Sequence, residues 1–118
     1  MVYQLRGQDG RPSRFASGTF VDQSGETTTL KPEDFTIRPI GSWKSPTTAI
    51  LYPSGWELSV PSKNLSLVLT PTVKDQELRT ESSTNVTYWE GRNTVTGKLG
   101  IENLTGNAYV ELVGYRPE

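Results

Sequence analysis

The fold class is decided by residues 56–69, which read WELSV-PSKN-LSLVL. Apolar and polar side chains alternate in both halves of this stretch, and a period of two is the side-chain period of a β-strand. The pattern therefore predicts two strands that turn one face toward a core. The residues expected on that face are Trp56, Leu58 and Val60 in the first strand and Leu65, Leu67 and Leu69 in the second.

The rest of the chain repeats this design of short β-runs separated by turns. Val, Ile, Leu and aromatic residues occur in brief runs, and Gly, Pro, Asn and Asp interrupt them, which is typical of all-β proteins. Residues 31–34 predict one helical turn, and residues 74–81 are charged enough to predict a solvated loop or edge. Eight or nine strands in one domain predict an antiparallel barrel or meander, and alternation alone leaves a two-sheet sandwich open. Strands are expected near residues 2–6, 15–22, 26–30, 35–40, 49–52, 56–60, 65–69, 86–96 and 106–115.

Size and charge exclude several classes of partner. A chain of 118 residues and 13.1 kDa is long enough for one domain with a single core. Its formal charge is -1 and its basic residues are scattered, so we expect no nucleic-acid partner and no anionic membrane surface. No apolar run approaches the roughly 20 residues of a membrane-spanning helix.

The chain contains no cysteine and no histidine. Disulfides, thiolate nucleophiles and Ser-His or Cys-His catalysis are therefore excluded within it, and a zinc or copper site is disfavoured. No glycine-rich loop precedes a helix in the way that phosphate binding requires. We expect neither a metal nor a cofactor.

The most distinctive chemistry is the sequence YWEG at residues 88–91. In a strand, Tyr88 and Glu90 share one face and Trp89 takes the other. Glu90 lies beside two aromatic rings, an environment that can make a carboxyl group a general acid. The more ordinary interpretation is an ion pair with a nearby arginine. Gly91 inside such a strand indicates a bulge or the close approach of another backbone.

Other acids and aromatic residues complete the set of candidates. Asp75 and Glu77 are two further carboxylates that can share a site with Glu90. Trp43 and Trp56 can line an apolar cavity together with the aromatic pair of residues 88–89. Ordinary core packing explains such rings more often.

The series of motifs resembles the C-terminal half of the carotenoid 1,2-hydratase and AttH-like family, whose members are also called predicted secreted hydrolases. The pieces that carry the resemblance run in order along the chain. They are residues 2–6 (VYQLR), 17–22 (SGTFVD), 30–35, 43–46 (WKSP), 52–56, 75–78 (DQEL), 88–91 (YWEG) and 106–115 (GNAYVELVGY).

The resemblance implies a lipocalin-like β-barrel over residues 1–118, the second of two barrels in tandem. The N-terminal barrel of the same protein is then a partner, and we expect the natural chain to continue upstream of Met1. The resemblance also implies a hydrophobic, isoprenoid or polyene-like ligand, and water addition to an alkene by acid catalysis. The family label leaves the location open among secreted, periplasmic and membrane-associated.

Residue roles follow from the same resemblance. Glu90 is expected as the proton donor or polar anchor, Tyr88 and Trp89 as pocket wall, and Asp75 and Glu77 as acids at the rim. We expect the chain alone not to be catalytic. Two alternatives remain: a non-catalytic lipid-binding or structural barrel, and a carbohydrate-binding β-sandwich that uses Trp43 and Trp56.

Overall fold

The structure, a computed structural model, describes residues 1–118 and contains eleven strands and two short 3-10 helices, η1 (Pro32–Asp34) and η2 (Pro61–Lys63). The predicted all-β class is confirmed, and η1 is the predicted helical turn. No helix is long and apolar enough to cross a membrane. The strands are β1 (Val2–Tyr3), β2 (Ser17–Val21), β3 (Thr27–Leu30), β4 (Thr36–Pro39), β5 (Ser42–Lys44), β6 (Leu51–Pro53), β7 (Trp56–Val60), β8 (Leu65–Pro71), β9 (Glu77–Arg79), β10 (Thr87–Leu99) and β11 (Glu102–Val113).

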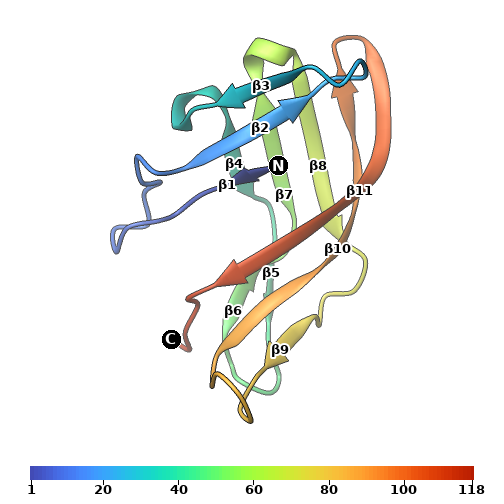
Figure 1. Ribbon diagram of the computed structural model, residues 1–118. Coiled ribbons are helices and arrows are strands. Elements are labelled where there is room, and N and C mark those ends of the chain that lie inside the picture. Colours follow the sequence, from blue (N-terminus) through green and yellow to red (C-terminus); the bar gives the residue numbers. More distant parts are fainter.

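Six strands form one curled antiparallel sheet in the order β11-β10-β8-β7-β4, and β9 pairs with the remaining part of β10 (Figure 1). Opposite residues of antiparallel strands share a face. Trp56 pairs with Leu69, and Leu58 pairs with Leu67. The predicted alternation is therefore confirmed, and these side chains lie on the concave face of the sheet.

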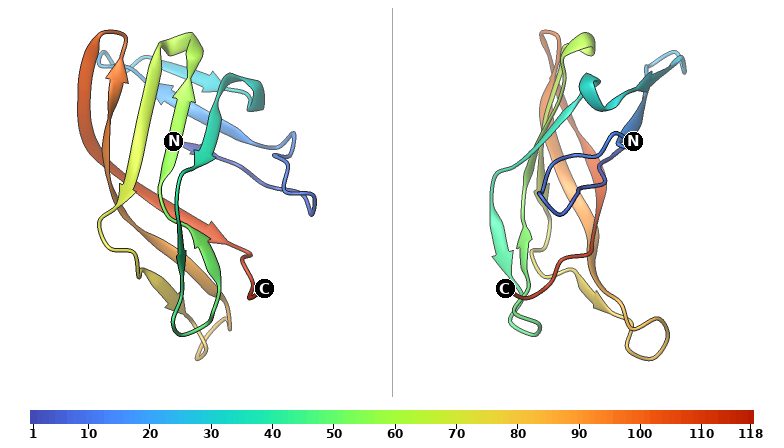
Figure 2. Two further views of the ribbon diagram at one scale, coloured as in Figure 1. Left: turned by 180° about the vertical axis from the view of Figure 1, so that it is seen from behind. Right: turned by 90° about the vertical axis from the view of Figure 1, so that its left-hand side faces the viewer.

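The three-stranded sheet β1-β2-β3 crosses the upper part of that concave face (Figure 2). A first core cluster joins the two sheets: Ala16, Leu30, Phe35 and Val60 are each almost completely buried. The hydrogen-bonded ladder does not continue from one sheet to the other. The architecture is thus a lipocalin-like half-barrel.

The strand count exceeds the predicted eight or nine because β5 and β9, of three residues each, were not predicted. β5 pairs with β6, and β9 pairs with the end of β10 that β8 leaves free. β9 lies in the charged stretch that predicted a loop or edge. Strands this short carry too little alternation to be recognised in a sequence, and only their partners define them.

The hairpin of β10 and β11 is longer than the sequence indicates. β10 has 13 residues and β11 has 12, and only Gly100 and Ile101 separate them. The strands expected near residues 86–96 and 106–115 leave a longer connection between them. Gly97 instead lies inside the strand, where an added side chain would overlap the backbone of Ser66. Gly100 has a positive φ of 59°, which glycine adopts at little cost.

A glutamine side chain fills the space opposite Gly91 of β10. β8 ends at Pro71 and β9 begins at Glu77, so this part of β10 has no strand beside it. The Gln76 amide replaces one: its Oε1 accepts from the Arg92 N–H at 3.1 Å, and its Nε2 donates to the Val73 carbonyl at 2.7 Å. A Cβ on Gly91 would overlap this amide. Gly91 therefore marks a close approach, but a side chain makes it and not the backbone that was predicted.

Gly91→Ala is expected to lower the free energy of unfolding by about 1–3 kcal/mol, because the added methyl group displaces an amide held by hydrogen bonds. Urea titration followed by tryptophan fluorescence measures the change. Gly106→Ala is the matched control, since a Cβ there meets nothing within 4 Å. Adding Gln76→Ala to Gly91→Ala should cost less than the sum of the two single changes. Equal stability of Gly91→Ala and the unmodified chain contradicts this account.

Candidate functional site

An apolar trough of about 1540 Å³ runs along the concave face of the large sheet. Its floor comes from β4, β7, β8 and β10. Residues 1–7 form one rim, and residues 104–115 form the opposite rim. Ligand pockets for small molecules usually enclose about 300–1,000 Å³. The space exceeds that range because it is open between the two rims. The apolar floor residues are Ile37, Trp56, Leu58, Leu67, Leu69 and Val95.

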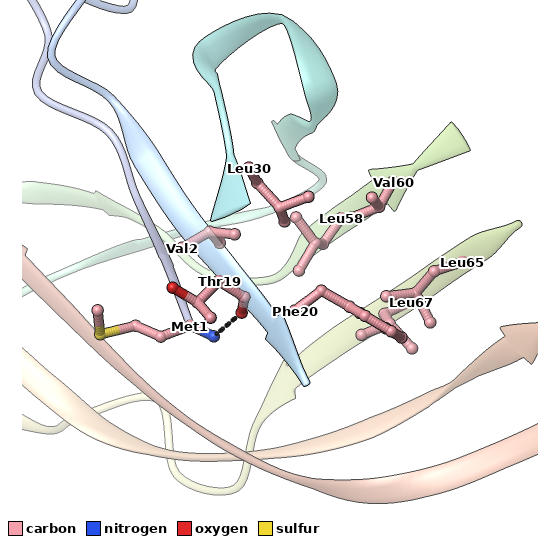
Figure 3. Close-up of a pocket in the computed structure, with 9 residues that line it drawn as sticks. All are labelled: Met1, Val2, Thr19, Phe20, Leu30, Leu58, Val60, Leu65 and Leu67. Atoms are coloured by element: carbon pink, nitrogen blue, oxygen red, sulfur yellow. Dashed lines mark hydrogen bonds between the residues drawn. The ribbon is translucent and has the colours of Figure 1, made fainter. Parts of the chain in front are cut away.

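A smaller hollow of about 160 Å³ adjoins the upper end of the trough, between β1-β2-β3 and the strands β7 and β8 (Figure 3). Its lining is apolar except for Thr19. Met1, Val2, Leu58 and Leu67 border both spaces. The Met1 amino group donates to the Thr19 carbonyl at 2.9 Å and so fixes this end of the rim. The trough therefore extends under the three-stranded sheet.

The predicted pocket tryptophans divide between trough and core. Trp56 lines the trough. Trp89 is 1% exposed and packs on Trp56, with ring centroids 6.0 Å apart and planes tilted by 54°. Its Nε1 donates to the Lys74 carbonyl at 2.8 Å. Trp43 stacks on Tyr52 with centroids 6.0 Å apart and does not line the trough. Trp89 thus belongs to a second core cluster with Ile50, Tyr52 and Trp56, and Trp43 packs against this cluster rather than lining the cavity.

Tyr88 and Glu90 lie on the convex face of β10, as the alternation predicts. Glu90 pairs across the ladder with Glu111, so two carboxylates share that outer surface. Partial loss of hydration, followed by the negative charge of Glu90, raises the pKa of Tyr109. Tyr88 and Glu90 do not line the trough. The structure therefore separates the predicted acid from the apolar space.

The alternative interpretation of Glu90, an ion pair with an arginine, is not observed. Arg79 pairs with Glu81, and Arg92 donates to Asn107 Oδ1. Glu90 takes part in no salt bridge. Its backbone N–H donates to the Gln76 carbonyl at 3.2 Å. Glu90 thus remains a partly buried surface carboxylate.

Glu77 faces the inside of the sheet, where it binds a turn of the chain. It lies opposite Trp89 in the ladder between β9 and β10. Ser45 Oγ donates to one carboxylate oxygen at 2.8 Å, and Thr48 Oγ1 donates to the other at 2.7 Å. Ser45 is 3% exposed. Glu77 therefore joins β9 to the β5–β6 hairpin, whereas Asp75 is exposed beside it. The three predicted acids do not meet in one site.

Tyr52 lies close to Glu77, the carboxylate that binds Ser45 and Thr48. The ring is 1% exposed, and its hydroxyl has no hydrogen-bond partner. Burial raises the pKa of Tyr52 above its ordinary value of 10.0, and the negative charge of Glu77 adds to the shift. The ring also packs on Tyr115, with centroids 5.5 Å apart. Tyr52 therefore ties the C-terminal segment to the core and stays protonated.

The contacts of some residues in this region could not be predicted from the sequence. Gln76 and Thr48 act through partners that lie at least 15 positions away along the chain. Asn93 is completely buried, and its Nδ2 donates to the Gly91 carbonyl at 3.1 Å while Oδ1 has no partner. Only its position two residues after Gly91, on the inward face of β10, marks Asn93 as buried.

Comparison with known proteins places this geometry in a family. The sequence model of the AttH-like family matches residues 1–115. The chain belongs to the AttH-like family. The crystal structure of a "putative AttH" from Nitrosomonas europaea, at 2.00 Å resolution, is similar to it with a TM-score of 0.84 and 32% sequence identity. The match covers 97% of this chain and 34% of that protein, so the chain spans about a third of its length. No curated protein matches the chain.

The pieces that carry the AttH resemblance meet in the folded chain. Ser45 comes from WKSP, Gln76 and Glu77 come from DQEL, and Trp89 and Gly91 come from YWEG. Each makes one of the contacts described above. These three motifs therefore mark the packing that joins β9, β10 and the β5–β6 hairpin, whereas the motifs at residues 2–6 and 106–115 line the trough.

Tyr52→Phe is expected to make stability less sensitive to alkaline pH. The unfolded chain loses the tyrosine proton near pH 10, whereas the folded chain keeps it because its pKa is raised. The stability that this group contributes is therefore complete below pH 10 and falls as the pH rises above it. Urea titrations at pH 8 and pH 11 measure the difference, which should be smaller in Tyr52→Phe. Tyr3→Phe, at an exposed position, is the control. An identical fall in Tyr52→Phe and the unmodified chain contradicts the account.

Proposed function

We propose that this chain supplies the apolar wall of a binding site for a hydrophobic ligand of the isoprenoid or polyene class. The observation that carries the proposal is the trough, in which leucine, valine and tryptophan side chains from four strands form one continuous concave surface. Exposed apolar surface of this extent in a folded chain marks a site of binding. A long, flexible hydrocarbon fits such a space better than a compact polar molecule does.

The shape of the trough agrees with an elongated ligand. It continues beneath β1-β2-β3 into the smaller hollow, whose lining is also apolar. Burial of apolar surface stabilises a complex by about 25 cal/mol per Å². A chain-like ligand that follows both spaces gains more of this energy than a short one. We infer that affinity increases with hydrocarbon length until the hollow is filled.

We favour binding over catalysis for this chain because no acid faces the trough floor in a form suited to proton transfer. Glu111 belongs to the rim, but its side chain shares the convex face with Glu90. Glu90, the proton donor that the resemblance implies, lies on the convex face of β10. Glu77 faces inward, but both of its oxygens accept hydrogen bonds from Ser45 and Thr48. A general acid has to lie within hydrogen-bond reach of the atom that it protonates. Water addition to an alkene would therefore need an acid from outside this chain.

The carbohydrate-binding alternative receives less support. Sugar-binding surfaces present flat aromatic rings to solvent, and Trp56 and Trp89 are buried. Trp43 is partly buried against Tyr52. The aromatic residues thus serve packing and the trough floor rather than an exposed platform.

Leu104→Glu is expected to weaken binding of a neutral naphthylamine dye about tenfold or more, because it places a carboxylate at the apolar rim. Leu104 lines the trough and is partly buried. Fluorescence titration of the purified chain gives the dissociation constants. Ile101→Glu is the matched control, since Ile101 is 97% exposed and lies outside the trough.

The same dye titration tests whether the Glu90 side chain takes part in binding. Glu90→Gln should leave the dye affinity unchanged, because its side chain is on the opposite face of β10. Equal affinities for Leu104→Glu and Ile101→Glu would show that the trough is not the binding site. A loss of about tenfold in Glu90→Gln would return Glu90 to the site and favour the acid role.

A further inference from the structure

The rim of the trough formed by β11 is a free strand edge. β11 pairs only with β10, and it is the last strand of the large sheet. It has 12 residues and contains no proline, lysine or arginine. Proteins usually protect a long exposed edge with such residues, or cover it, because its unpaired backbone groups can bind another strand. β11 has none of these protections.

The hydrogen bonds of Arg92 in β10 show which backbone groups of β11 face β10 and which face the open side. Its N–H donates to Gln76 Oε1 and its carbonyl accepts from the Thr72 N–H, both on the β8 side. Because backbone groups alternate between the two sides of a strand, Gly91 and Asn93 point toward β11. Their ladder partners are Val110 and Ala108, so even-numbered residues of β11 bond to β10.

Odd-numbered residues of β11 therefore direct both their N–H and C=O groups to the open side. None of these backbone groups is bonded elsewhere in the chain. A hydrocarbon ligand cannot satisfy them, since it offers neither donors nor acceptors. A strand of polypeptide can satisfy all of them. The residues concerned are Asn103, Thr105, Asn107, Tyr109, Glu111 and Val113.

The opposite rim of the trough also has unpaired backbone groups. Met1 exchanges backbone hydrogen bonds with Thr19 of β2, so the next residue, Val2, points its N–H and C=O away from β2. The trough thus lies between two unpaired backbone edges. The concave side of β11 is also lightly filled, with Gly106 and Ala108 at its centre, and a Cβ on Gly106 would meet no atom within 4 Å.

We propose that the edge of β11 binds an extended polypeptide strand that closes the open side of the trough. Its alternate residues are apolar and lie over Gly106 and Ala108, and a basic residue near one end faces Glu111 on the convex side. This is strand addition, in which main-chain hydrogen bonds supply affinity and alternate side chains supply specificity. The inference concerns a polypeptide partner and does not depend on the ligand proposed above.

The test is calorimetric titration of the chain with the peptide Lys-Val-Thr-Val-Thr-Val-Thr-Val-Lys. We expect saturable one-to-one binding. Two further peptides carry methyl groups on alternate backbone nitrogens, one on the even-numbered and one on the odd-numbered residues. The peptide whose methyl groups block the hydrogen bonds to β11 should bind about tenfold more weakly than the unmethylated peptide. Equal affinity of all three peptides, or no binding of any, overturns the proposal.

Thr105→Pro supplies a matched variant. Proline is tolerated at a strand edge and removes one N–H that faces the open side. It should weaken peptide binding about fivefold to tenfold, whereas Thr105→Val, which keeps that N–H, should not. If Thr105→Pro fails to fold, the methylated peptides still decide the question. A concentration-dependent dimer that excludes the peptide, measured by light scattering, would assign the edge to a second copy and overturn the proposed partner.

Discussion

The burial of Trp89 against Trp56, with Gly91 two residues later beneath the Gln76 amide, fixes the register on which the rest of the structure depends. In a strand, a slip by one residue moves every side chain to the other face. Such a slip in β10 would place Tyr88, Glu90 and Arg92 in the core. Truncation of a buried tryptophan costs about 3–5 kcal/mol, so Trp89 alone opposes that slip strongly. β10 pairs with β8, β9 and β11, and its register therefore orients the whole large sheet.

The sequence was informative wherever one strand carried its own alternation. Residues 56–69 predicted the two central strands and their inward faces, and YWEG predicted the separation of Trp89 from Glu90. It could not show contacts between distant segments. Gln76 opposite Gly91, and Ser45 bound to Glu77, join parts of the chain that no local pattern relates. The short strands β5 and β9 were missed for the same reason, because each exists only through its partner.

The candidate site was predicted less well than the fold. Glu90 was predicted as the acid partly because Trp89 precedes it, but adjacent residues lie on opposite faces of a strand. The space that can hold a ligand is built from residues of the predicted inward faces, such as Leu58, Leu67 and Leu69. Three of the AttH-like motifs account for packing at β9 and β10, whereas VYQLR and GNAYVELVGY form the two rims of the trough. Family membership and the candidate site thus share residues of this chain.

The register that Trp89 and Gly91 fix in β10 leaves β11 as an open edge above an apolar trough. Amide hydrogen exchange of the free chain, followed residue by residue by nuclear magnetic resonance, tests this most directly. The account predicts slow exchange at Leu104, Ala108 and Val110, and fast exchange at Thr105, Asn107 and Tyr109. Uniformly slow exchange along β11, or the opposite alternation, would contradict it.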